Sequence, residues 1–303
     1  MKSIPIALEE ACSLCPRACS APRTSKKSVC RADRLKVALA ALHPYEEPCL
    51  AGAKGAGTVF FSHCNLKCVF CQNHEISHAG AGLEVSVPRL SEIFLELEAA
   101  GAATIDLVSP GHYVKEVAQA LLLAKARGLA LPVVWNSNGY ELCESLERLE
   151  GLVEVFLPDL KFMDSRASAR YCGARDYFER ASRAVRRMVE MTGPARFAQG
   201  VMTRGVLIRH LVMPGMAQDS MRILDWIRES FADAVWVSIM SQYVPMHRAK
   251  DFPEIDRRVF SAEYLKVVRH ARAIGLVNAY VQDRSAGSDA YVPVFDGRGV
   301  LSE

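Results

Sequence analysis

Short β-branched and apolar runs alternate with amphipathic segments from about residue 57 onward. The amphipathic segments carry apolar residues at helical spacing, for example Leu90, Ile93 and Leu97. The apolar runs predict strands over residues 57–63, 104–110, 132–138, 153–161, 205–214, 234–242 and 276–282. Strands that alternate with helices are typical of βα units and a parallel sheet.

Six or seven such units follow one another without a change in composition. This favours an α/β fold, a partial (βα)6-type barrel of parallel strands, over a doubly wound open sheet. Two helices are expected to begin at Asp219–Ser220 and at Ser261, which are suitable capping residues.

The first 50 residues have a different composition, rich in cysteine and proline, with one predicted helix over residues 32–42. Pieces this short rarely stay folded without a metal or a disulfide. We therefore predict a Cys-rich metal-binding N-terminal appendage over residues 1–50 and a partial-barrel domain over residues 51–303.

Composition narrows the protein class only a little. The chain has 303 residues, 50% of them hydrophobic, which suffices for one large domain with a small appendage. The net charge of +3 argues neither for nor against nucleic acid, and we expect no such partner. No apolar stretch approaches the roughly 20 residues of a membrane helix, and the start lacks a secretory signal, so we expect a cytoplasmic protein.

Three cysteines, Cys64, Cys68 and Cys71, follow the first predicted strand in what we call the cysteine loop (residues 61–73). In the cytoplasm, clustered cysteines indicate a metal site over disulfides. Four thiolates would complete a site, whereas three leave one metal position open, as a catalytic metal requires. The alternatives are free buried cysteines or a zinc site completed by His63, His74 or His78.

The cysteine spacing, with Phe70 directly before the third cysteine, resembles the cluster loop of the radical S-adenosylmethionine (SAM) superfamily. More narrowly, it resembles the pyruvate formate-lyase activating enzyme and its uncharacterised relatives, over about residues 44–285. The resemblance implies an oxidoreductase in which Cys64, Cys68 and Cys71 hold a [4Fe–4S] cluster whose fourth iron is chelated by SAM. It further implies anaerobic conditions, an electron donor such as flavodoxin or ferredoxin, and reductive cleavage of SAM to a 5′-deoxyadenosyl radical.

Polar motifs follow the other predicted strands, where barrel enzymes carry their catalytic residues. By resemblance, Asp159 and Lys161 match an Asp-x-Lys pair that contacts SAM, and Asn138 matches a strand-three Asn-Gly. Arg209 matches an arginine near the radical centre. The alternatives are a loop cap or a surface charge for Asp159 and a buried ion pair for Arg209.

The second strand ends in a motif that departs from the family pattern. The activating enzymes carry Gly-Gly-Glu here to bind the amino group of SAM, whereas this chain has Ser109-Pro110-Gly111-His112. The acid is missing, so we expect carbonyls around Ser109 and Gly111 to bind SAM, with Asp159 as the nearby carboxylate.

A second cysteine group, Cys12, Cys15, Cys19 and Cys30, supplies four thiolates. They could saturate a zinc ion or hold a second iron–sulfur cluster, and the residues do not distinguish the two. The group resembles the head of the uncharacterised relatives, and its role could be purely structural.

Three functions remain open at this point. The chain could activate a glycyl-radical protein, act on a small molecule or in cofactor maturation, or be a non-catalytic metal-binding sensor. The arginine-rich segment 166–187 predicts a solvated helix face, with a docking surface as the alternative.

Overall fold

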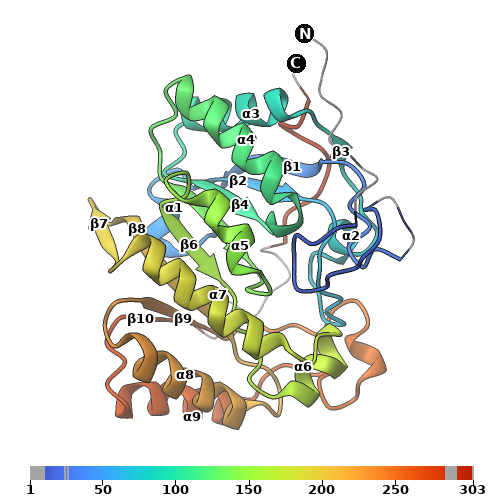
Figure 1. Ribbon diagram of the computed structural model, residues 1–303. Helices are drawn as coiled ribbons and strands as arrows, with labels where there is room; N and C mark the ends of the chain where they lie inside the picture. The colour runs from blue at the N-terminus through green and yellow to red at the C-terminus, as the bar shows by residue number, and fades with distance from the viewer. Residues whose placement is uncertain (1–10, 24, 26, 284–291, 302–303) are drawn as a thin grey trace.

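The computed structural model describes residues 11–23, 25, 27–283 and 292–301 (Figure 1). Its sheet has the strand order β10-β9-β8-β6-β5-β4-β2-β1-β3, and β7 pairs with β8 beside this path. The strands are β1 (Lys36–His43), β2 (Ala56–Phe61), β3 (Leu83–Glu84), β4 (Ile105–Val108), β5 (Val133–Ser137), β6 (Val155–Pro158), β7 (Arg196–Ala198), β8 (Val201–Leu211), β9 (Trp236–Met240) and β10 (Ala279–Val281).

The strands β2, β4, β5, β6, β8, β9 and β10 follow one another in the sheet, and each is parallel to the next in this order. The sheet is mostly parallel and does not close, so the prediction of an α/β partial barrel is confirmed. The carboxyl ends of these strands meet at one edge, which is the edge where the polar motifs were expected.

Helices lie around the strands, with α3 beside α4 and α8 beside α9 (Figure 1). The α-helices are α1 (Pro48–Ala51), α2 (His74–Ser77), α3 (Val87–Ala99), α4 (Val114–Ala126), α5 (Cys143–Leu146), α6 (Ser165–Cys172), α7 (Tyr177–Thr192), α8 (Ala217–Phe231) and α9 (Ser261–Ala273). Short 3₁₀ helices are η1 (Gly111–Tyr113), η2 (Glu147–Leu149) and η3 (Ala249–Asp251). Leu90, Ile93 and Leu97 of α3 are buried, as their spacing predicts. Across the described ranges, no helix has the length and apolar character to cross a membrane.

The helix predicted over residues 32–42 is wrong, because most of this segment lies in β1, Lys36–His43. It pairs antiparallel with β2 and β3 and lies within the sheet. Alanine and leucine favour a helix locally, but pairing with Phe61 and its neighbours outweighs that weak preference. The division of the chain at residue 50 stays a prediction, with β1 lying on the N-terminal side of it.

The predicted start of α8 is also wrong. The helix begins at Ala217, so Asp219 lies in its first turn and does not cap it. Its carboxylate instead accepts backbone N–H groups of Met163 (2.9 Å) and Asp164 (3.0 Å), which join α8 to the loop before α6. The start of α9 at Ser261 is confirmed, but the residue at the N-cap is Phe260, so Ser261 is the first helical residue and not the cap.

Candidate active site

The cysteine loop follows β2 at the carboxyl edge of the parallel strands. Its backbone is bound to the end of α6 on both sides of Cys68. The N–H of Lys67 donates to the carbonyl of Cys172 (3.2 Å), and the N–H of Val69 donates to the carbonyl of Tyr171 (2.8 Å). The middle of the loop therefore has a fixed position relative to the barrel.

Each of the three sulfur atoms of the loop has a polar neighbour. These neighbours are Asn138 Nδ2 at 3.3 Å from Cys64 Sγ, Cys172 Sγ at 3.2 Å from Cys68 Sγ, and Ser77 Oγ at 3.2 Å from Cys71 Sγ. Burial and the charges of the neighbouring thiolates raise the pKa of Cys64, and raise that of Cys71 to about 12. The hydrogen bond with Cys172 and burial raise the pKa of Cys68. The three sulfurs thus share one partly buried environment of raised thiol pKa, in which thiolates require a positive partner such as iron.

A zinc ion and a [4Fe–4S] cluster require different arrangements of the cysteine sulfurs. Among the residues that the structure describes, no three His, Cys, Asp or Glu side chains could hold one metal ion. A zinc site completed by a histidine would need four ligands that converge on a single point. In a [4Fe–4S] cluster the thiolates bind separate irons, so the sulfurs surround a cluster without converging.

The predicted SAM-binding residues at the ends of β4 and β5 lie beside Cys64. Ser109, Gly111 and Asn138 line a small cavity of about 10 Å³ together with Cys64. Asn138 Nδ2 also donates to Asn65 Oδ1 (2.7 Å), which connects the end of β5 to the cysteine loop. Ser109 has a positive φ of 58°, a conformation that non-glycine residues adopt at a cost and that often marks functional sites.

The same small cavity contains Glu141, a buried carboxylate that the sequence analysis missed. It accepts hydrogen bonds from Trp135 Nε1 (2.8 Å) and Ser137 Oγ (2.7 Å). Burial raises the pKa of Glu141 to about 7. A Cβ atom at Gly111 would lie only 2.9 Å from Glu141 Oε1, so a larger residue there would displace this carboxylate. The carboxylate of Glu141 therefore lies next to the Ser109-Pro110-Gly111-His112 motif, which itself contains no acidic residue.

Asp159, Lys161 and Arg209 form a partly buried ion triad at the ends of β6 and β8. Asp159 Oδ2 accepts from Lys161 Nζ (2.6 Å) and Oδ1 accepts from Arg209 Nε (3.0 Å). Burial would raise the pKa of Asp159, but the charges of Arg209 and Lys161 outweigh it and hold that pKa below its ordinary value. Asp159 and Arg209 therefore form the ion pair that was the alternative for Arg209, and Asp159 is not a surface charge.

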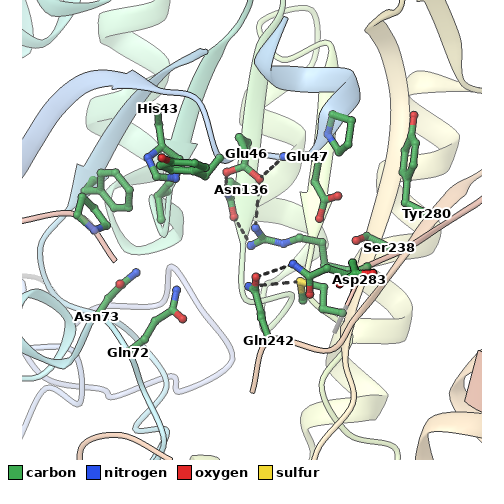
Figure 2. A pocket seen from close by; sticks show the side chains of 18 of the residues that line it. His43, Glu46, Glu47, Gln72, Asn73, Asn136, Ser238, Gln242, Tyr280 and Asp283 are labelled. Atoms are coloured by element: carbon green, nitrogen blue, oxygen red, sulfur yellow. Dashed lines mark hydrogen bonds and ion pairs between the residues drawn. The ribbon is translucent and has the colours of Figure 1, made fainter. Parts of the chain in front are cut away.

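A cavity of about 530 Å³ lies inside the arc of strands. Gln72 and Asn73, directly after the third cysteine, lie at one end, and Glu46 and Glu47 lie at the other (Figure 2). Arg209 also lines this cavity, 3.6 Å from Glu46. The cysteine loop therefore borders a space large enough for a small molecule.

The acids at the far end of this cavity were also missed. Glu46 lies 3.6 Å from the Arg209 guanidinium and accepts from Asn136 Nδ2 at 3.4 Å. Burial and the charge of Glu46 raise the pKa of Glu47 to about 7 and also raise that of Asp106. Asp106 Oδ1 is buried and has no hydrogen-bond partner within the described part of the chain. Glu46 and Glu47 fell in the predicted appendage, and their only signal was an acidic pair flanked by Pro44 and Pro48.

The four N-terminal cysteines form no disulfide. Cys15 and Cys30 are buried, and the charges of Cys30 and Cys12 add to the burial that raises the pKa of Cys15 to about 12. Arg17, between Cys15 and Cys19, donates to the carbonyl of Asn65 (2.7 Å), so this segment contacts the cysteine loop. A metal at these cysteines stays a prediction.

The arginines of segment 166–187 mostly pair with carboxylates. Arg170 pairs with Glu254, Arg180 with Asp176, Arg183 with Glu179 and Arg187 with Glu147, Glu150 and Glu190. These exposed pairs favour a solvated face over a docking surface.

A partial barrel with a three-cysteine loop after its first parallel strand defines a class of iron–sulfur enzyme. Residues 58–227 match the sequence profile of the radical SAM superfamily. The chain belongs to this superfamily and is a radical SAM enzyme; the family uses a [4Fe–4S] cluster and SAM. The chain is also similar to the uncharacterised protein MJ0674 of Methanocaldococcus jannaschii, with 30% identity over 273 residues, 88% of this chain and 75% of that protein.

Solved structures share the fold. SuiB of Streptococcus suis, bound to SAM, matches with a TM-score of 0.53 and 13% identity, over 73% of this chain and 48% of SuiB. A radical SAM methyltransferase of Sphaerobacter thermophilus matches with a TM-score of 0.53 and 15% identity, over 75% of this chain and 66% of the methyltransferase. The chain thus spans about half the length of SuiB, and at these identities the likeness concerns the fold alone.

Proposed function

We propose that Cys64, Cys68 and Cys71 bind the [4Fe–4S] cluster and that the enzyme takes a hydrogen atom from a polar small molecule in the 530 Å³ cavity. The observation that carries this proposal is that the cavity begins at Gln72 and Asn73, directly after Cys71. When bound, the reduced cluster and SAM supply a carbon radical, and the cavity is the space that such a radical would face.

The ion triad has a defined task in this proposal. Lys161 is the cation for the carboxylate of SAM, because an ammonium forms strong charge-assisted hydrogen bonds with carboxylates. Asp159 orients Lys161 and Arg209, since its two oxygens bind one of them each. Asn138 holds Cys64 and the adjoining loop in place.

The amino group of SAM needs acceptors at the end of β4. Carbonyls around Ser109 and Gly111 remain our candidates, and Glu141 lines the same small cavity. A buried ammonium without an acceptor would cost about 1–3 kcal/mol or more, so this part of the site has to supply one.

The charged lining favours a polar small molecule as the substrate. The cavity offers charges and hydrogen bonds from Glu46, Glu47 and Arg209 that a glycine backbone does not need. In small-molecule sites, a small number of such polar groups usually fixes the orientation of the ligand. Activation of a glycyl-radical protein is the alternative that the sequence predicted, and either reaction needs an electron donor such as flavodoxin or ferredoxin.

The first experiment tests the cluster assignment. Anaerobically reconstituted protein, reduced with dithionite, should convert SAM into methionine and 5′-deoxyadenosine. The Cys64→Ala, Cys68→Ala, Cys71→Ala triple variant should lose this conversion together with its cluster iron. Cys143→Ala, whose sulfur lies at 3.9 Å from the carbonyl of Arg183, is the matched control and should keep both. Undiminished SAM cleavage in the triple variant would refute the assignment.

The second experiment separates the two substrate classes. Deuterated cell extract is divided by size into a small-molecule and a protein fraction, and each is added to the reduced enzyme with SAM. Deuterium in 5′-deoxyadenosine from the small-molecule fraction supports the proposal. Label transferred from the protein fraction alone would support the glycyl-radical alternative instead.

A further inference from the structure

Cys172 stands alone in the sequence but contacts the middle cysteine of the cysteine loop. It is the last residue of α6, it is 0% exposed, and its sulfur lies 3.2 Å from Cys68 Sγ. The two residues are 104 positions apart, so the contact is a product of the fold and not of local spacing.

Backbone hydrogen bonds fix this contact. Lys67 and Val69, on either side of Cys68, donate to the carbonyls of Cys172 and Tyr171. The two sulfurs therefore stay together as long as the end of α6 remains bound to the loop.

The chemistry of the contact depends on which sulfur carries the proton. A thiolate that binds iron has none, so in the cluster-loaded enzyme the hydrogen must come from Cys172. We propose that the Cys172 thiol donates a hydrogen bond to the Cys68 ligand sulfur and thereby raises the reduction potential of the cluster. This inference rests on the proposed binding of the cluster by the cysteine loop.

The direction of the effect follows from charge. Reduction adds negative charge to the cluster and its sulfurs, so a donor stabilises the reduced form more than the oxidised form. The other two ligands have donors of the same kind, Asn138 Nδ2 on Cys64 and the Ser77 hydroxyl beside Cys71. Cys172 completes this set and acts through Cys68, which makes it a positioning residue.

The test compares Cys172→Ala, Cys172→Ser and the control Cys143→Ala, each loaded with iron to the parent level. Cluster reduction is followed by electron paramagnetic resonance during a potential titration without SAM. For Cys172→Ala we expect an about tenfold lower ratio of reduced to oxidised cluster at a fixed potential, which is about 59 mV for a one-electron couple. Cys172→Ser should stay close to the parent, because its hydroxyl can donate, and the control should not change.

A loaded Cys172→Ala variant that titrates with the parent would overturn the inference. If that variant does not load iron, infrared spectroscopy decides: the loaded parent should show a low-frequency S–H stretching band that is absent from Cys172→Ser. Cys49 and Cys143 also carry thiols, so the band is read from the difference between the spectra of the parent and Cys172→Ser, and a Cys172 band at the free-thiol frequency in that difference would also overturn the inference. An unchanged potential in protein that cleaves SAM refutes this inference alone, whereas a parent protein without a cluster refutes the proposed function.

Discussion

Replacing Asp159 with asparagine keeps the size of the side chain and removes the charge that lies between Lys161 and Arg209. The two cations approach the carboxylate to 2.6 and 3.0 Å, and the three side chains are only 16–18% exposed. Removing one partner of a buried ion pair typically costs about 3–5 kcal/mol, because it leaves an uncompensated charge. Since some solvent reaches this triad, we expect the lower end, about 3 kcal/mol of unfolding free energy.

The assay is thermal and urea unfolding of iron-loaded protein under anaerobic conditions. A loss of about 3 kcal/mol corresponds to a fall in Tm of roughly 6 °C for a chain of this size. Asp233→Asn is the control, because Asp233 pairs with Arg228 but is 61% exposed, and such surface pairs contribute about 0–1 kcal/mol.

The pH dependence adds a second check on the same variant. The pKa of Asp159 in the fold lies below its ordinary value, so its contribution is fully present above the unfolded pKa. That contribution is lost as the pH falls through the lower folded pKa. The difference between the parent and Asp159→Asn should therefore be constant near neutral pH and shrink below about pH 4. Equal stability of Asp159→Asn and Asp233→Asn at pH 7 would show that the triad does not act as a unit.

Three further predictions concern single groups. Lys161→Met should weaken SAM binding by about 1.5–3 kcal/mol with the cluster intact, measured by anaerobic calorimetry, and parent-like affinity would remove Lys161 from the SAM site. The pKa of Glu141 is higher in the folded than in the unfolded protein, so the parent should lose up to about 1.4 kcal/mol of unfolding free energy per pH unit as the pH rises from about 4.5 to 7. Glu141→Gln has no carboxyl group to titrate and should not show this loss. Equal pH slopes of the parent and the variant in urea unfolding would contradict this. Cys15→Ala should lower the Tm and the content of any second metal, while the iron bound by the cysteine loop stays. Metal analysis and thermal unfolding measure both, and an unchanged Tm and metal content would refute a metal at the N-terminal cysteines.

Sequence periodicity was sufficient for the parallel sheet because each βα unit carries its own pattern. The segments predicted over residues 104–110 and 132–138 contain β4 and β5, and the apolar stripe of α3 is buried. It was not sufficient for β1, since Val37 to Leu42 has a composition that suits a buried helix or a strand equally. Only the distant partner strand β2 decides between them.

In the candidate site, too, some residues could be predicted from local sequence patterns and others only from the three-dimensional structure. Cys64 could be predicted from the cysteine spacing, and Asp159 and Arg209 from the polar motifs at the predicted strand ends together with the family resemblance. Cys172 reaches that edge from the end of a helix, and Glu46 reaches the cavity from a loop before β2. Neither position follows from spacing in the sequence, because tertiary packing alone brings them there.

The role expected for Asp159 changes once its surroundings are known. The sequence offered it as the carboxylate nearest to the amino group of SAM, but each of its oxygens is bound by a cation, Lys161 or Arg209. A carboxylate engaged in this way acts on a ligand mainly through the cations that it orients. We therefore expect Asp159 to influence the carboxylate end of SAM through Lys161. The amino end then depends on the Ser109 side of the site, where a buried acid that a linear motif could not reveal lies within the same small cavity.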